Sequence, residues 1–273
     1  MVIKEALLEA EKILKVAGIE DAHFEVKCLI KDVFKKDPLS DEDFLEAEKL
    51  FALAHRRALG YPLQYLIGEW DFYDITLYIG EGVLIPRSDT ETLVDKALEI
   101  LEKKENPYVL DLCSGSGAIP LVLSRKKEGK YFAVEKEDSA YGYLNKNNER
   151  YGNPIKLYKA DALDKSFISS LERFDIITAN PPYLTKEDMD SLQKEVEYEP
   201  STALYGGEDG LFFYKKISSL YFSKLKPNGA LVFEIGYSQG EKVSKILKEA
   251  GYRDISVSKD LNNLDRVVIG YKR

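Results

Sequence analysis

The sequence predicts an α/β protein with a mainly parallel, doubly wound sheet that ends in an antiparallel edge hairpin, preceded by a small helical bundle. Two observations carry this prediction. Strand and helix patterns alternate from Pro107 onward, and the last two strand patterns are joined by a short link with no helix between them. The 273 residues are enough for such a sheet with a smaller part beside it.

Composition narrows the class of protein further. The chain has 39 basic and 47 acidic residues, a net charge of −8, which argues against a protein that grips long nucleic acid. No apolar run approaches the ~20 residues of a membrane span, and the first residues carry acids where a signal peptide is apolar. Only two cysteines, Cys28 and Cys113, and two histidines are present. We therefore expect a cytoplasmic protein with no disulfide scaffold, no metal site and no membrane contact.

The first 66 residues predict a helical bundle. Apolar residues recur at three- and four-residue intervals over 2–17, a second helical pattern covers about 22–35, and a third begins near Ser40, a plausible N-cap, and ends at Leu59. This region, residues 1–66, carries 10 basic and 13 acidic residues. It is either a cap on the larger domain or a docking surface for a macromolecular partner, and the pattern favours neither.

Residues 67–86 are aromatic, β-branched and rich in turn residues, and are assigned to a hairpin or extended linker. Residues 87–273 then form the α/β domain, which opens with a helix over about 89–104. Within it the sequence predicts strands at 108–113, 131–135, 155–159, 174–179, 229–235, 252–258 and 265–271, and helices at 118–127, 138–150, 209–225 and 238–250.

Acidic residues and glycines stand where three of these strands end. The first strand runs into DLCSGSG, which starts at Asp111 and leads into a helix, so that glycines let the backbone approach a ligand closely. A carboxylate there does not suit a pyrophosphate but suits a cationic amino group. Glu135 ends the second strand and fits two ribose hydroxyls. Asp161-Ala162 follows the third, where an acid can meet the adenine amino group. Together these strand ends describe an adenosine joined to an amino acid, which is S-adenosylmethionine.

The fourth strand runs into Asn180-Pro181-Pro182-Tyr183. Pro181 removes a backbone N–H, and the proline pair holds the chain extended. Such a turn suits a planar group bearing NH₂, because the Asn180 side chain and the Pro181 carbonyl can accept its two hydrogens while the Tyr183 ring packs on its face. Accepting both hydrogens favours electron density on a poorly nucleophilic amide nitrogen and aims it at a sulfonium methyl group.

The order of these motifs resembles the N5-glutamine methyltransferases that modify peptide chain release factors. The resemblance runs from about Arg56 to the C-terminus and rests on YPLQYLIGEWDFY (61–73), VLIPRSDTETLV (83–94), VLDLCSGSGAI (109–119), NPPY (180–183), YEPSTALYGGEDGL (198–211), EIGYSQG (234–240) and KDLNNLDRVV (259–268). Several amino-methyltransferases share NPPY, whereas the IPR segment, the 203–210 segment and the closing DRVV are more specific. The resemblance implies the Rossmann-like, seven-stranded fold of class I S-adenosylmethionine-dependent methyltransferases.

The resemblance also implies roles for single residues. The methionine end of S-adenosylmethionine would be lined by Asp111, Cys113, Ser114, Gly115, Ser116 and Gly117, the ribose held by Glu135, and the adenine by Asp161 and Ala162. Asn180, Pro181 and Tyr183 would be catalytic, with Asn180 also beside the cofactor. The substrate glutamine would lie against Asn180, Pro181, Pro182 and Tyr183, with Pro86 and Arg87 walling its pocket. The substrate would be the glutamine of the release factors' Gly-Gly-Gln loop, the N-terminal bundle would contact the factor, and S-adenosylhomocysteine would be the product.

Three positions depart from the family pattern. Cys113 stands where glycine is more common, Glu135 where aspartate is usual, and Ser88 where many members have proline. We interpret Cys113 as a small packing residue rather than a reactive thiol. The extra methylene of Glu135 is expected to shift the ribose contact slightly.

Three alternatives stay open at this point. Glutamine methylation of a large-subunit ribosomal protein uses the same chemistry. Amino-methylation of adenine in nucleic acid shares NPPY, but it normally needs a target-recognition region and a positive cleft. A nicotinamide-dependent oxidoreductase or a non-catalytic nucleotide-binding module is disfavoured by Asp111 and by the NPPY turn. We expect release factors as the protein partner, no direct contact with nucleic acid, and a monomer.

Overall fold

The computed structural model describes residues 1–273 and divides into two compact units. The first, hereafter the bundle unit, consists of Met1–Trp70, Ile79–Glu81 and Gln193–Tyr198. The second, hereafter the sheet unit, consists of Asp71–Tyr78, Gly82–Leu192 and Glu199–Arg273. The chain therefore returns to the bundle unit twice after first leaving it, which no pattern in the sequence predicts.

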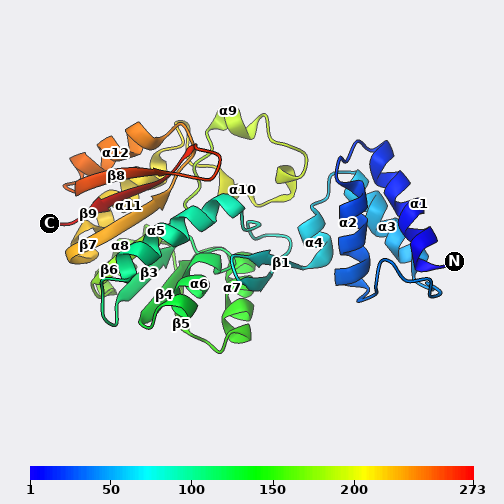
Figure 1. Cartoon of the computed structure of the whole chain (residues 1–273). Coiled ribbons are helices and arrows are strands. Elements are labelled where there is room, and N and C mark those ends of the chain that lie inside the picture. The colour runs from blue at the N-terminus through cyan, green and yellow to red at the C-terminus, as the bar shows by residue number, and fades with distance from the viewer. The chain divides into compact units, whose positions relative to one another are not determined.

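Amphipathic helices build the bundle unit (blue to cyan in Figure 1). The apolar positions of the first helix, among them Ile3, Ala6, Ala10 and Leu14, are fully buried, as their three- and four-residue spacing predicts. The elements are α1 (Ile3–Val16), α2 (Ala22–Cys28), a single π-helical turn (Leu29–Val33), α3 (Ala47–Ala58) and α4 (Leu63–Ile67).

The prediction that the third helix begins near Ser40 is wrong, because α3 begins at Ala47. Ser40 Oγ instead accepts a hydrogen bond from the Glu42 backbone N–H at 3.1 Å, which closes a turn. The Glu42 carbonyl in turn accepts a hydrogen bond from the backbone N–H of Ile3 at 3.1 Å. Backbone groups used in this pairing cannot also join a helical ladder, so the helix starts only after it.

The distant segment Gln193–Tyr198 is held in the bundle unit by charge and by aromatic contact. Buried Arg57 donates to Glu25 (Nε to Oε2, 2.6 Å) and also to Glu195 (Nη2 to Oε1, 2.7 Å). The Tyr61 and Tyr198 rings meet edge to face with their centroids 5.1 Å apart. A buried arginine with two carboxylate partners is costly to leave unpaired, so this segment is bound firmly.

The chain also forms two β-sheets. The strands β1 (Glu69–Phe72) and β2 (Ile75–Tyr78) make a hairpin of their own. The main elements of the sheet unit follow in the order α5 (Glu91–Leu101), β3 (Tyr108–Leu112), α6 (Ala118–Lys126), β4 (Lys130–Glu135), α7 (Asp138–Arg150), β5 (Ile155–Lys159), α8 (Lys165–Ser170), β6 (Phe174–Ala179), α9 (Lys186–Met189), α10 (Ser201–Leu204), α11 (Phe212–Tyr221), β7 (Leu225–Glu234), α12 (Gly240–Glu249), β8 (Arg253–Lys259) and β9 (Asp265–Tyr271).

The seven-stranded sheet has the order β5-β4-β3-β6-β7-β9-β8. The first five strands in this order run parallel, whereas β9 is antiparallel to both β7 and β8. The predicted fold class, including the antiparallel edge hairpin, is therefore confirmed. Strand order reverses between β3 and β6, and ligands of such sheets bind at the carboxyl ends of the strands at that point.

Helices cover both faces of the sheet (Figure 1). Helices α5, α6 and α7 pack on one face, and α8, α11 and α12 on the other. The second face holds most of the large aromatic core, in which Tyr214, Tyr221, Phe233 and Tyr252 are fully buried. Burial of each such ring contributes about 1.5–3 kcal/mol, so this layer fixes the sheet that carries the strand ends.

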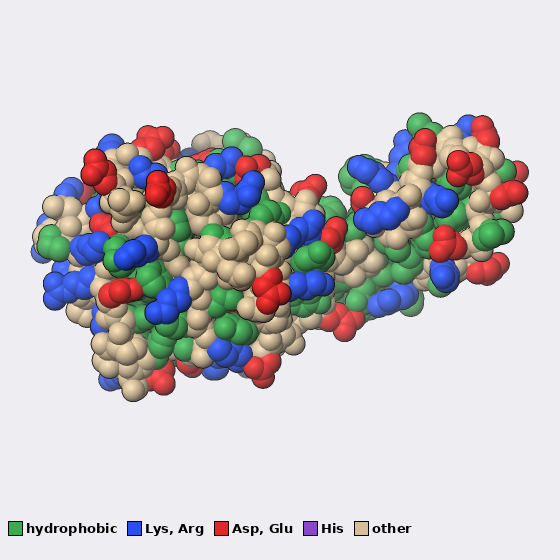
Figure 2. Space-filling model, turned by 90° about the horizontal axis from the view of Figure 1, so that it is seen from below, with side chains coloured by type: hydrophobic (Ala, Val, Ile, Leu, Met, Phe, Trp, Pro, Cys, Tyr) green, Lys and Arg blue, Asp and Glu red, His purple; other side chains and the backbone are tan.

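The element bounds differ from the sequence prediction mainly at β7 and α11. Strand β7 begins at Leu225 rather than 229, and α11 ends at Tyr221 before a short 3-10 turn, because Leu225 already pairs with Phe174 of β6. The short helices α4, α8, α9 and α10 were not predicted. Acidic and basic side chains are interspersed on the face shown in Figure 2. Among the helices, none has the length and apolar character needed to cross a membrane.

Candidate active site

A cavity of about 870 Å³ opens at the carboxyl ends of β3, β4, β5 and β6. Its volume lies in the range of small-molecule sites. Four strand ends and the loop before α5 meet there, all within the sheet unit. Of the residues predicted from the sequence, the cavity is lined by Pro86, Arg87, Cys113, Ser114, Gly115, Ser116, Glu135, Asp161, Ala162, Asn180 and Pro182.

Four other predicted residues do not line the cavity: Asp111, Gly117, Pro181 and Tyr183. Gly117 precedes α6 and lies against Leu144, which a Cβ on Gly117 would approach to 2.7 Å. Pro181 is buried, and Tyr183 packs on the aromatic core of the sheet, where burial of its ring is favourable. Burial raises the pKa of Tyr183 to about 12, so its hydroxyl stays protonated. The catalytic roles of Pro181 and Tyr183 stay predictions.

The loop after β3 is shaped by left-handed backbone conformations. Cys113, Gly115 and Gly117 have φ values of 56°, 53° and 86°. Glycine adopts such values without strain, whereas a residue with a Cβ is strained by roughly 1–2 kcal/mol. Cys113 therefore occupies a position at which glycine would be less strained. Burial raises the pKa of the Cys113 thiol far above its usual range, which leaves it protonated and unreactive.

Glu135 at the end of β4 ties this loop to the next strand end. Its Oε2 accepts a hydrogen bond from Gly115 N at 2.8 Å, and its Oε1 accepts from Lys136 N at 2.7 Å and Glu137 N at 2.8 Å. The carboxylate has room for one further donor, because its two oxygens offer about four lone-pair directions. Asp161 lies nearby, since Lys136 also pairs with it at 3.1 Å. Both acids line the cavity on the side of β4 and β5.

Asp111 lies behind the cavity lining and is fully buried. Its Oδ1 accepts a hydrogen bond from Thr178 Oγ1 at 2.6 Å, whereas its Oδ2 has no partner. Burial raises the pKa of Asp111 to about 7, although the hydrogen bond from Thr178 acts to lower it. The hydroxyl of Ser114, which lines the cavity, donates to the Asp111 backbone carbonyl at 3.1 Å. An unpartnered buried carboxylate oxygen behind a cavity wall fits a positively charged ligand group.

Asn180 lines the cavity at the end of β6. Its Nδ2 donates to Thr90 Oγ1, 3.4 Å away, and the carboxyl group of Glu234, buried at the end of β7, lies beside both side chains. Burial raises the pKa of Glu234 to about 7, although the neighbouring Thr90 side chain and the charge of Arg266 act to lower it. The Thr90 and Glu234 side chains therefore lie next to Asn180, and the sequence analysis assigned neither of them a role.

Glycines of the 203–210 segment fix the backbone of the NPPY turn. A Cβ on Gly206 would lie 2.6 Å from the Pro182 carbonyl oxygen, and one on Gly210 would lie 2.3 Å from that of Tyr183. Gln239 Nε2 also donates to the Tyr183 carbonyl at 3.1 Å. Only glycine permits so close an approach, which explains why this glycine-rich segment and NPPY occur together in the chain.

The Pro86-Arg87 segment is anchored by Glu199, whose side chain is 1% exposed. The Glu199 carboxylate accepts a hydrogen bond from Ile85 N at 3.0 Å and forms a hydrogen-bonded ion pair with Arg87. Charge-assisted pairs of this kind are stronger than neutral hydrogen bonds. Glu199 therefore fixes one wall of the cavity, although the sequence analysis assigned it no role.

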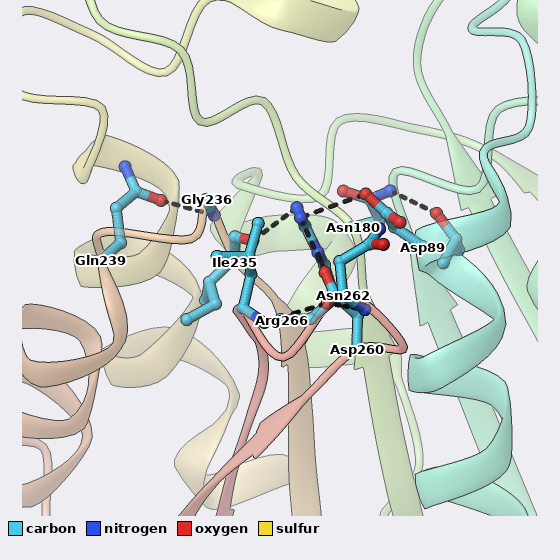
Figure 3. A network of polar contacts seen from close by, with 10 residues as sticks. Asp89, Asn180, Ile235, Gly236, Gln239, Asp260, Asn262 and Arg266 are labelled. Carbon is cyan, nitrogen blue, oxygen red and sulfur yellow. Dashed lines mark hydrogen bonds and ion pairs between the residues drawn. The ribbon is translucent and has the colours of Figure 1, made fainter.

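A second charged group, shown in Figure 3, lies beside Asn180. Buried Arg266 donates to Asp260 Oδ2 (Nη2, 3.0 Å) and pairs with Asp89 (3.1 Å). It also donates to the Ile235 carbonyl at 3.4 Å. Arg266 lies on β9, Ile235 follows β7 and Asp89 precedes α5, so this arginine joins the edge hairpin to the segments that flank the cavity.

Other cavity residues were missed by the sequence analysis. Thr90, Pro200 and Tyr205 lie in the family-like segments 83–94 and 198–211, which could have pointed to them, although most residues of these segments were given no individual role. The missed residues include Gly82, Thr90, Lys186, Met189, Pro200, Tyr205 and Phe212. Gly82, Pro200 and Tyr205 lie outside helices and strands, where hydrophobic periodicity gives no information, and Lys186 and Met189 lie in the four-residue helix α9, which is too short to show a period.

The sheet order, the glycine loop and the strand-end acids are those of a class I S-adenosylmethionine-dependent methyltransferase. Solved structures share this fold. A methyltransferase from Pyrococcus furiosus is 17% identical with a TM-score of 0.50, covering 66% of this chain and 82% of that one. A 16S rRNA methyltransferase from T. thermophilus, in complex with AdoMet and guanosine, is 20% identical with a TM-score of 0.53, covering 72% of this chain and 47% of that one.

Sequence comparison is more specific. Residues 5–68 match the family model described as PrmC N-terminal domain, and residues 90–209 match Conserved hypothetical protein 95. A release factor glutamine methyltransferase from Clostridium botulinum is 36% identical over 98% of both chains. One from Clostridium acetobutylicum is 34% identical over 100% of this chain and 99% of its own. The chain belongs to the release factor glutamine methyltransferase family, and the predicted resemblance is confirmed.

Proposed function

We propose that this protein transfers the methyl group of S-adenosylmethionine to the side-chain amide nitrogen, N5, of the glutamine in the Gly-Gly-Gln loop of peptide chain release factors. Its near full-length relatives carry the corresponding name. The observation that carries the proposal in the structure is one cavity lined by the acid that ends β4, the acid that follows β5, the loop after β3 and Asn180.

The residues present fit S-adenosylmethionine. The unpartnered Oδ2 of Asp111, behind Ser114, would favour the amino group of its methionine part. Glu135, which retains room for another donor, would hold the ribose, and Asp161 with Ala162 the adenine. When bound, this cofactor supplies an electrophilic methyl group on a sulfonium sulfur.

The protein's own part in the reaction is to position the substrate amide. Asn180 would accept an N–H hydrogen of the glutamine side chain and orient its nitrogen, while Arg87 and Pro182 wall the cavity. The new N–C bond forms as the methyl–sulfur bond breaks, and the amide nitrogen then loses its extra proton to water, because an N-methylated amide cation is strongly acidic. No covalent protein intermediate is needed.

We further propose that the bundle unit contacts the release factor, and that the glutamine reaches the cavity along the Pro86-Arg87 segment. The bundle has a near-neutral mixture of charges, 10 basic and 13 acidic residues within 1–66, which suits a protein surface better than a nucleic acid.

Methyl transfer from labelled S-adenosylmethionine onto purified release factor tests the proposal, with the large-subunit ribosomal protein and duplex DNA as parallel acceptors. The product is digested and the methyl group located by mass spectrometry. A single methyl on the Gly-Gly-Gln glutamine, lost when that glutamine is replaced by alanine, is expected. Label on the ribosomal protein or DNA alone would overturn the substrate. The variant Asn180→Ala should lose most transfer yet keep its affinity for S-adenosylhomocysteine; preserved turnover would remove Asn180 from the mechanism.

A further inference from the structure

Glu234 and Asn180 occupy equivalent places on neighbouring parallel strands. Ala179 of β6 is paired with Phe233 of β7, so the next residue of each strand, Asn180 and Glu234, lies at the same edge and on the same face of the sheet. Glu234 is 2% exposed, and its carboxyl group is close enough to the Asn180 side chain for Asn180 to lower its pKa. The fold itself therefore brings a carboxyl group directly behind the residue assigned to the substrate amide.

Pairing with a cation does not explain this buried carboxyl group. Arg266, the cation that acts on the Glu234 carboxyl group, uses its N–H donors for Asp260, Asp89 and the Ile235 carbonyl, as Figure 3 shows. Glu234 Oε2 has no hydrogen-bond partner at all. Burying a carboxyl group with an unpartnered oxygen costs free energy, so a gain elsewhere is needed to account for it.

What Glu234 provides in return is a fixed orientation of the Asn180 side-chain amide. Asn180 carries one acceptor, Oδ1, and one donor, Nδ2, and the two ends of the amide are nearly equal in size. Above its pKa of about 7 the Glu234 carboxyl group is ionised and can only accept, so it favours the rotamer in which Nδ2 faces Glu234 and Thr90. Oδ1 is then left for an incoming N–H. The hydroxyl of Thr90 alone could not make this selection, because it both donates and accepts.

We propose that Glu234 is a positioning residue that orients the Asn180 carboxamide so that Oδ1, and not Nδ2, is presented to the substrate amide. The inference rests on the proposed function of the cavity. Glu234 acts through Asn180 and does not itself touch the substrate.

The test is Glu234→Gln, which keeps size and shape but can donate as well as accept. We expect kcat for release factor to fall by about 10- to 100-fold, as for other partners that orient an active-site group. The KM for release factor and the affinity for S-adenosylhomocysteine should stay unchanged. Glu234→Asp, which keeps an acceptor-only group, should recover part of the lost kcat. The matched control is Asp175→Asn, the same chemical change at the opposite end of β6, where Asp175 pairs with Lys226 at 2.6 Å.

A second readout needs no turnover. In protein labelled with ¹⁵N-asparagine, the Asn180 side-chain amide signal should shift and exchange faster in Glu234→Gln, and stay unchanged in Asp175→Asn. Wild-type kcat in Glu234→Gln, or an unperturbed Asn180 signal, would overturn the inference. A wild-type protein that fails to methylate release factor would refute the proposed function instead, and the Asn180 signal would still decide whether Glu234 orients the amide.

Discussion

Asp111 Oδ1 accepts a hydrogen bond from Thr178 Oγ1 at 2.6 Å, while Asp111 Oδ2 is buried without a partner. Thr178 lies on β6 and Asp111 on β3, and the two residues are paired across the strands. The contact joins the strand that leads to the glycine loop with the strand that leads to Asn180. The contact satisfies only Oδ1 of the carboxyl group, and Oδ2 is left for a cationic group.

Cofactor binding should therefore release protons below neutral pH. Burial raises the pKa of Asp111 to about 7 in the free protein, so the group is largely protonated at about pH 6. A bound ammonium group favours the carboxylate and lowers this pKa, so affinity should weaken as pH falls from about 7 to about 6. Calorimetry with S-adenosylhomocysteine, in buffers of different ionisation enthalpy, measures the released protons.

The variant Asp111→Asn provides the control for that experiment. It should bind S-adenosylhomocysteine more weakly at pH 8 and lose the proton release between about pH 6 and 7. The stability of the free protein should depend on pH in the opposite direction from cofactor affinity. A folded-state pKa raised above the unfolded value makes wild-type stability fall as pH rises from about 4 to about 7, a loss that Asp111→Asn should lack. Unchanged affinity and proton release would exclude a role for this carboxyl group.

Because Cys113 has a left-handed backbone conformation, glycine should stabilise the protein more than alanine at this position, the reverse of the usual order. At ordinary positions alanine is more stable than glycine by roughly 0.5–1 kcal/mol. At a φ of 56°, the Cβ of alanine is strained by roughly 1–2 kcal/mol. Cys113→Gly should therefore unfold at a higher temperature than Cys113→Ala. A higher melting temperature for Cys113→Ala would show that the strain is relieved in some other way.

Gly210 lies so close to the NPPY turn that adding a single methyl group, in Gly210→Ala, should destabilise the protein strongly. Gly210→Ala places a Cβ 2.3 Å from the Tyr183 carbonyl oxygen at a φ of 66°, so the free energy of unfolding should fall by at least about 2 kcal/mol and methyl transfer should fall with it. Gly142→Ala is the matched control, because Gly142 lies within α7 with open space around it and alanine favours helix. It should be neutral or stabilising in thermal unfolding, with full activity.

The ion pair of Glu199 with Arg87 should act on substrate binding. Glu199→Gln retains an acceptor for Ile85 N but loses the charge that holds Arg87. We expect the KM for release factor to rise by about tenfold, equivalent to ~1.4 kcal/mol, with kcat and cofactor affinity little changed. Steady-state methylation kinetics measure this change. An equal fall in kcat with constant KM would mean that the pair acts in the transition state instead.

Local pattern predicted the sheet well because its strands are apolar and β-branched runs bounded by turns. Ile155–Lys159, Phe174–Ala179 and Asp265–Tyr271 have the predicted bounds. The helix expected at Ser40 failed because that segment pairs with the N-terminus, which is a tertiary effect. Local sequence patterns carry no information about pairings between distant segments.

The same distinction applies to the site. Residues at strand ends, such as Glu135 and Asn180, could be predicted because strand direction places them at one edge. Glu199 and Thr178 could not, since their partners lie 112 and 67 residues away in the chain. The burial of Asp111 behind the cavity wall likewise depends on packing that no short segment contains.

The return of residues 193–198 to the bundle unit limits how this enzyme can evolve. A domain that hangs on a single linker can be exchanged between genes by one crossover. Here the Arg57–Glu195 ion pair and the Tyr61–Tyr198 contact belong to a unit encoded in three separate stretches. A transplanted N-terminal region would arrive without its other two pieces and would leave Arg57 with one carboxylate partner fewer. New substrate preference should therefore arise by point substitution on the existing bundle, not by recombination of whole domains.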